Sequence, residues 1–315
     1  MKPFFKELNV SSVAVFFQHL TNGLTLGGIY ALIALGYTMV YGILKFINFA
    51  HGDILMVGAY MGMFAFDFLR GDAPLGAWTF ISFLLAMVFS AVFCAVLGMF
   101  IEKVAYKPLR RAARLAPLLS AIGVSFILSN GAAWMWGTQS RKLNYPFDNS
   151  PMTIMGISIT PHQILVLAVS FVMMIALKLF VDRSRMGKAM RATSLDQDTA
   201  QLMGINVNSV ISLTFAIGSA LAAIGGMLIA LDYKCYPTLG TMTGLKAFVA
   251  AVVGGIGNIT GAMLGGIILG LVETFGVAVL GIPQGYRDTI AFVILIIILL
   301  LKPEGLLGKV EKEKV

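Results

Sequence analysis

The polar residues best placed to bind a solute stand at two breaks between apolar stretches. The first break, residues 42–53, holds a lysine, an asparagine, a histidine and an aspartate; the second, residues 254–261, is glycine-rich and contains one asparagine. Amide, imidazole and carboxylate groups favour hydrogen bonding and charge pairing with a polar ligand. The candidates from the two breaks are Asn48, His51, Asp53, Gly255, Gly257 and Asn258.

Catalytic and metal-binding motifs do not occur in the sequence. The Gly-Lys pairs at 187–188 and 308–309 lack the Ser or Thr that completes a phosphate-binding loop. The three histidines stand singly without metal-ligand spacing, and no Gly-x-Ser-x-Gly nucleophile motif is found. We therefore expect no catalytic residue, cofactor or metal site, and no ATP hydrolysis by this chain.

The composition predicts an all-α, polytopic integral membrane protein. Hydrophobic residues make up 58% of the chain and charged residues 12%, with a mean hydropathy of +0.87, whereas soluble domains are about one quarter charged. A bilayer-spanning helix needs roughly 20 apolar residues, so we expect about 8–10 transmembrane helices, some broken or re-entrant, in one domain over 1–315. The predicted spans are 18–41, 54–69, 78–101, 115–137, 161–181, 209–231, 240–257, 258–280 and 288–301.

Both breaks then fall at membrane helices, where irregular backbone survives only if protein buries it or it lines a cavity. One glycine-interrupted segment in each half points to a translocation path; two ordinary interfacial loops are the alternative. Glu273 is a further path candidate. Placing an ionisable side chain inside a membrane span costs free energy, so such residues usually have a functional role. The alternatives for Glu273 are snorkelling to the interface or a misplaced boundary. The shortage of other intramembrane charges argues against a proton-driven carrier.

Basic residues indicate the orientation. The chain has a net charge of +8, and basic residues cluster in loops 102–114 and 182–208. This positive-inside pattern favours two cytoplasmic loops and argues against nucleic-acid binding. Segment 138–160 is then outside, and it reads as an ordered loop. Parity requires that 240–257 also crosses, and it places the N-terminus outside if 18–41 is a single crossing.

A glycine stripe predicts one tightly packed helix. Small residues four apart let neighbouring backbones approach closely in a membrane. The stripe consists of Gly257, Gly261 and Gly265, with a second pair at Gly266 and Gly270.

Loop 182–208 predicts two short amphipathic helices. Met186, Ala189, Met190 and Thr193 share one helical face. Asp196 and Asp198 are suited to start a second helix, with Ala200 and Met203 as its apolar face and Gly204 as its stop. Such a pair fits a groove on a partner protein; a solvated connector is the alternative.

These strings resemble LivH-type permease subunits of branched-chain amino-acid ABC transporters. The likeness lies in residues 22–42 and 47–53, and it continues through 102–110, 120–123, 184–187, 202–206 and 246–257. It covers about residues 18–308, essentially the whole chain.

The resemblance implies the ABC importer permease fold in the bacterial inner membrane, with a path formed at the interface with a second, LivM-type permease. Two cytoplasmic ATP-binding subunits and a periplasmic amino-acid-binding protein would complete the importer. It also implies that 182–208 is the coupling loop that docks into an ATPase, with the candidate residues Met186, Gly187, Met190, Asp198, Ala200, Met203 and Gly204. Branched-chain amino acids are the expected substrates. Urea or short amides remain an alternative within the family, and a self-sufficient secondary transporter or channel remains one outside it.

Overall fold

The computed structural model describes residues 2–110, 112–113, 115–154, 156–279 and 281–308. Residues 111 and 114 of the first basic loop and residues 309–315 of the tail lie outside this set. The long helices are α1 (Lys2–Leu44), α2 (His51–Arg70), α3 (Ala77–Ile101), α4 (Leu115–Trp136), α5 (Pro161–Arg183), α8 (Val207–Asp232), α9 (Leu239–Gly254), α10 (Ile259–Ala278) and α11 (Arg287–Leu301). In the described part, eight helical segments are long and apolar enough to cross a membrane, which confirms the predicted polytopic all-α fold.

Two helices form the centre of the bundle. In the most apolar 18-residue stretch of α1, 83% of the residues are buried, and the same share is buried in α8. The share is 28% in α3 and 6% in the segment containing α11. The exposed side chains of the outer helices are large and apolar, such as Val92, Phe93 and Phe126. Apolar surface on the outside and polar contacts inside are what a hydrocarbon solvent requires.

Glycine packing joins α10 to two neighbours. A methyl group on Gly266 would overlap the backbone of Ala31 in α1, and one on Gly270 would overlap Gly27. Gly261 and Gly265 instead abut the backbone near the end of α9. The two glycine sets therefore lie against different helices, which allows α1, α9 and α10 to pack without intervening side chains.

Gly257 does not belong to this stripe. It precedes α10, has a φ of +92°, and a methyl group there would lie 3.8 Å from Gly42, an ordinary contact. Asn258 caps the helix by accepting a hydrogen bond from the Gly261 amide at 3.1 Å. The four-residue recurrence thus runs past the start of the helix into a turn.

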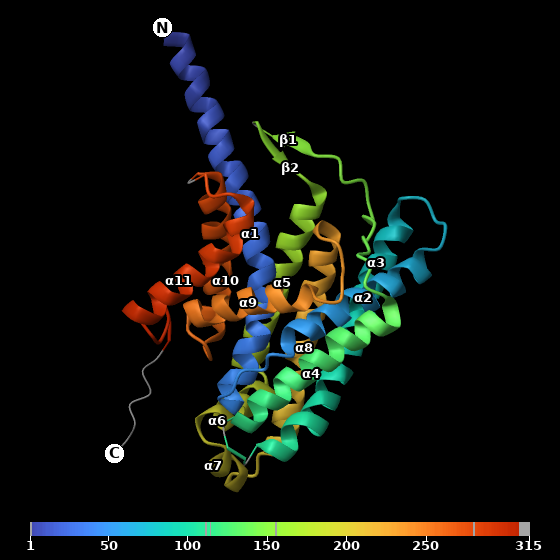
Figure 1. Cartoon of the computed structure of the whole chain (residues 1–315), viewed down its shortest axis with the longest axis vertical. Coiled ribbons are helices and arrows are strands. Elements are labelled where there is room, and N and C mark those ends of the chain that lie inside the picture. The colour runs from blue at the N-terminus through green and yellow to red at the C-terminus, as the bar shows by residue number, and fades with distance from the viewer. Residues whose placement is uncertain (1, 111, 114, 155, 280, 309–315) are drawn as a thin grey trace.

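Helix α9 runs across the bundle instead of along it (Figure 1). Its 16 residues would extend roughly 24 Å, less than the ~30 Å of a hydrocarbon core. The predicted crossing by 240–257 therefore stays a prediction.

The connections differ from the expected loops in two places. Within segment 138–160, residues Met152–Ile154 and Ile157–Ile159 pair as a small antiparallel hairpin, β1 and β2. Residues 102–109, expected as loop, continue α3 as a π-helical turn (Glu102–Tyr106) and a short 3-10 turn (Lys107–Leu109). Arg110 forms an ion pair with the buried Glu102 carboxylate, which also accepts a hydrogen bond from Ser212. These contacts connect Arg110 and the π-helical turn to α8.

Loop 182–208 contains α6 (Arg185–Leu195) and α7 (Gln197–Leu202), the two short helices that the sequence predicts. They lie together at one end of the bundle, and the β hairpin lies toward the other (Figure 1).

Candidate translocation site

A cavity of about 520 Å³ lies between α2, α4 and α9, and we call it the α2–α4–α9 cavity. It combines aromatic walls with hydroxyl, amide and carboxylate groups, as ligand sites do. Its lining residues are Tyr37, Phe49, Asp53, Ile122, Ser125, Phe126, Ser129, Asn130, Ala133, Thr138, Tyr236, Pro237, Thr238, Gly240, Thr241, Gly244 and Leu245.

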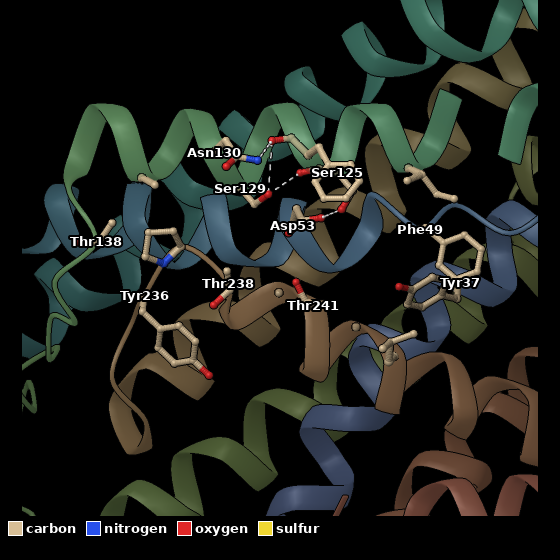
Figure 2. Close-up of a pocket in the computed structure, with 17 residues that line it drawn as sticks. Tyr37, Phe49, Asp53, Ser125, Ser129, Asn130, Thr138, Tyr236, Thr238 and Thr241 are labelled. Atoms are coloured by element: carbon tan, nitrogen blue, oxygen red, sulfur yellow. Dashed lines mark hydrogen bonds between the residues drawn. The ribbon is translucent and has the colours of Figure 1, made fainter. Parts of the chain in front are cut away.

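Asp53 supplies the carboxylate of this cavity. It is the third residue of α2 and is only 1% exposed. The Ser125 hydroxyl donates a hydrogen bond to Oδ2 from the facing helix α4, as Figure 2 shows. Oδ1 has no hydrogen-bond partner among the described residues. The side chain is therefore buried at the cavity with half of its accepting capacity unused.

His51 and Asn48 do not line the α2–α4–α9 cavity. The Asn48 Oδ1 accepts hydrogen bonds from the Ala50 amide at 3.1 Å and the Tyr106 hydroxyl at 2.6 Å. The His51 ring lies edge-on to Tyr37, with centroids 4.6 Å apart, and a methyl group on Gly36 would overlap its imidazole. These two residues shape the turn that presents Asp53.

Glu273 lies at a second cavity of about 480 Å³. Its Oε2 accepts from the Tyr30 hydroxyl, the Lys246 ammonium and the Arg287 guanidinium, each at 3.1 Å. Lys246 also lies 2.6 Å from a carboxylate oxygen of Asp288. This network joins α1, α9, α10 and α11, and Glu273 is fully buried within it. Glu273 is therefore ion-paired inside the protein, and its part in transport stays a prediction.

Gly255, Gly257 and Asn258 lie at a third place. The amides of Leu306 and Leu307 donate to the carbonyls of Val253 and Gly254 at 2.9 and 3.0 Å. Asn258 Nδ2 donates to the Leu307 carbonyl at 2.7 Å. Gly255, with a φ of +105°, packs against the same C-terminal segment. The seven path candidates thus separate into three groups, of which one residue, Asp53, lines the α2–α4–α9 cavity.

The helices of the α6–α7 loop, residues 184–206, are capped by hydrogen bonds from within the loop. The Ser184 hydroxyl accepts from the Gly187 amide at 2.8 Å, and a side chain at Gly187 would overlap the Val181 carbonyl. Asp196 accepts from the Thr199 and Asp198 amides. These hydrogen bonds, from Thr199 above all, lower the pKa of Asp196 below its usual range. Gly204 follows α7 with a φ of +83°.

The face of this loop that is available to a partner differs from the expected one. Met190 and Ala200 are 4% exposed because they pack against their own chain. Met203, expected to share a face with Ala200, is 79% exposed, and Leu195 and Leu202 are 88% and 87% exposed. The exposed apolar groups therefore stand at the ends of α6 and α7.

The sequence prediction missed the cavity residues of α4 and of the segment before α9. Ser125 and Ser129 interrupt a largely apolar span at a spacing of four residues, which places them on one helical face. That pattern could have found them. Tyr236 and Thr238 offer no comparable pattern.

Membrane-length helices around cavities with buried polar and charged groups define an integral membrane transport protein. The family profile described as branched-chain amino acid transport system / permease component matches residues 19–299. The chain is 45% identical to the high-affinity branched-chain amino acid transport system permease protein BraD of Pseudomonas aeruginosa, over 95% of this chain and 98% of that protein. It is 43% identical to the corresponding LivH of Escherichia coli K12, with the same coverage.

A more distant likeness extends to the ribose import permease protein RbsC of Escherichia coli K12, 25% identical over 68% of this chain and 66% of that protein. The chain belongs to the family of branched-chain amino acid transport system permease components. The resemblance drawn from the sequence motifs is thereby confirmed.

Proposed function

We propose that this chain is one of two permease subunits of an ATP-driven importer of branched-chain or other hydrophobic amino acids in the bacterial inner membrane. The observation that carries the proposal is the match, over almost the whole of each chain, to permeases of high-affinity branched-chain amino-acid transport systems. The α2–α4–α9 cavity supports it because apolar walls and a carboxylate suit a small amphipathic solute.

A second, LivM-type permease completes the path on the α4 side. Asn130 is exposed on α4 and lines the cavity, although an uncovered side-chain amide is a poor neighbour for lipid. Phe126, beside it, is 63% exposed. A related subunit seated over this face would close the cavity and cover the amide. A periplasmic amino-acid-binding protein delivers the solute from the side of Thr138 and Tyr236.

The α6–α7 loop is the coupling loop that docks into one of two cytoplasmic ATP-binding subunits. Leu195, Leu202 and Met203 project from it as exposed apolar groups, and such groups on a short helix pair suit a groove on a partner. The buried residues of this loop, which pack it against the rest of the chain, include Gly187, Met190 and Ala200. ATP hydrolysis is performed by the partner subunit.

Reconstitution tests the proposal against its alternatives. The chain is co-expressed with a second permease, two ATPases and the binding protein encoded beside it, and uptake into proteoliposomes is measured. We expect leucine, isoleucine or valine uptake that requires ATP and the binding protein, and none by the chain alone. Uptake by the chain alone without ATP would establish a secondary carrier or channel. Urea or short-amide uptake in place of amino acids would establish the other substrate class.

A further inference from the structure

We propose that Asp53 binds the ammonium group of the transported amino acid inside the α2–α4–α9 cavity, while the aromatic and aliphatic walls accept its apolar side chain. This inference rests on the proposed function and assigns a substrate-binding residue to it.

The first argument is the unused oxygen of Asp53. The carboxylate is 1% exposed, and Oδ1 has no hydrogen-bond partner among the described residues. Burying a carboxylate oxygen without a donor is unfavourable unless a ligand or partner supplies one. An ammonium group supplies both the donor and the compensating charge. The unpartnered oxygen of Asp53 therefore matches the chemistry of an ammonium ligand.

Asp53 also lies where the backbone of α2 attracts negative charge. The residue lies in the first turn of the 20-residue helix α2, where the helix dipole stabilises negative charge. Among the described residues, the hydrogen-bond donor to its side chain is the Ser125 hydroxyl of α4. Ser125 holds Oδ2, and the other oxygen is left for a ligand.

The remaining lining explains what such a ligand looks like. Tyr37 and Phe49 stand together at one end of the cavity, and Asp53 and Ser125 lie between them and Thr238 (Figure 2). The lining contains no Lys, Arg or His among the described residues. The cavity therefore suits a ligand with an amine and an apolar side chain. A carboxylate on that ligand would find neutral hydrogen-bond donors but no cationic side chain among the described lining residues.

Glu273 also has an unpartnered oxygen, Oε1, but the charges around it differ from those around Asp53. Three donors, from Tyr30, Lys246 and Arg287, already converge on one oxygen of Glu273. Two of them are cations, so an ammonium ligand would compete with permanent partners. Among the described residues, Asp53 has a neutral hydroxyl donor and no cationic partner.

The experiment uses the complete importer in proteoliposomes with Asp53→Asn, which keeps the size of the side chain and removes its charge. Asp67→Asn is the matched control, because Asp67 is an exposed carboxylate on the same helix. We expect leucine uptake to fall at least about ten-fold in Asp53→Asn, to recover partly in Asp53→Glu, and to remain unchanged in Asp67→Asn. Equal uptake by the wild type and Asp53→Asn would overturn the inference.

A protection assay separates binding from a folding defect. Ser129→Cys introduces a thiol into the cavity lining, while Cys94 and Cys235 are both buried. Leucine and isoamylamine, an amine without a carboxylate, should slow modification of that thiol by a small methanethiosulfonate reagent. The acid 4-methylpentanoate should not, and Asp53→Asn should abolish the protection. Equal protection by the acid, or protection that survives Asp53→Asn, contradicts the inference.

The two proposals fail in different ways. A wild-type complex that takes up no amino acid, with ATP and the binding protein present, contradicts the proposed function. A wild-type complex that takes up leucine, with Asp53→Asn equal to it, contradicts only the role of Asp53.

Discussion

The side-chain amide of Gln197 donates a hydrogen bond of 2.9 Å to the backbone carbonyl of Ile43. Ile43 is the penultimate residue of α1, where helix carbonyls have no partner within the helix. The bond therefore ties α7 to the end of α1, only a few residues before the turn that contains Asn48. That turn is fixed in its place by the Tyr106 hydroxyl and leads directly into Asp53.

Gln197→Ala should weaken the coupling between ATP hydrolysis and transport. Loss of one hydrogen bond to a helix end removes about 1 kcal/mol, so the subunits should still co-purify. We expect a several-fold drop in leucine uptake per ATP hydrolysed, measured in proteoliposomes. Gln201→Ala, an exposed glutamine on the same helix, is the control. If both variants keep the wild-type ratio, the Gln197 link does not transmit motion.

Leu202→Glu should release the ATPase without unfolding the permease. The side chain is 87% exposed, so a charge there has no cost inside this chain but opposes burial in a partner groove. Co-purification of the ATPase should be lost while membrane insertion persists. The matched charge control is Gln201→Glu, which should retain the ATPase. A fully assembled Leu202→Glu complex would move the docking surface elsewhere.

Gly270→Ala should destabilise the permease itself. The added methyl group would overlap the Gly27 backbone in α1, and overpacking of this kind costs about 1–3 kcal/mol. A lower midpoint of thermal unfolding in detergent is expected. Gly285→Ala adds the same methyl where nothing lies within 4 Å and should leave the midpoint unchanged. Equal midpoints for both variants would show that α1 and α10 move apart to accommodate the methyl group at little cost in stability.

Glu273→Gln should be among the most destabilising substitutions in the bundle. It leaves the cations of Lys246 and Arg287 facing a neutral amide in a buried place, and breaking a buried ion pair costs about 3–5 kcal/mol. Adding Lys246→Met to Glu273→Gln should recover part of the loss, because it removes a buried ammonium whose remaining partner is the exposed carboxylate of Asp288. Additive losses in unfolding free energy would mean that the two residues are not coupled.

Features of the fold set by local chemistry could be predicted from the sequence. Apolar length located the membrane helices, and Asp196 and Gly204 bounded α7 because an N-cap and a left-handed stop act within a few residues. The caps need no knowledge of the rest of the fold. The same holds for Gly266 and Gly270, whose spacing alone indicates close packing.

The candidate site was harder to predict because its parts meet through packing. Asp53 and Ser125 are 72 residues apart, and no spacing rule joins them. The inward direction of Ala200 depends on what the rest of the chain places beneath it, and periodicity does not supply that information. Gly257 was assigned to a helix because a four-residue repeat does not mark where the helix begins.

The C-terminal segment has a consequence for the order in which the protein matures. The turn between α9 and α10 is held by the amides of Leu306 and Leu307 and by the bond from Asn258 to the Leu307 carbonyl. During synthesis these partners emerge some fifty residues after the turn itself. Both α10 and α11 must therefore be synthesised before the hydrogen bonds of this turn can form. A nascent chain halted within α11 lacks these hydrogen bonds.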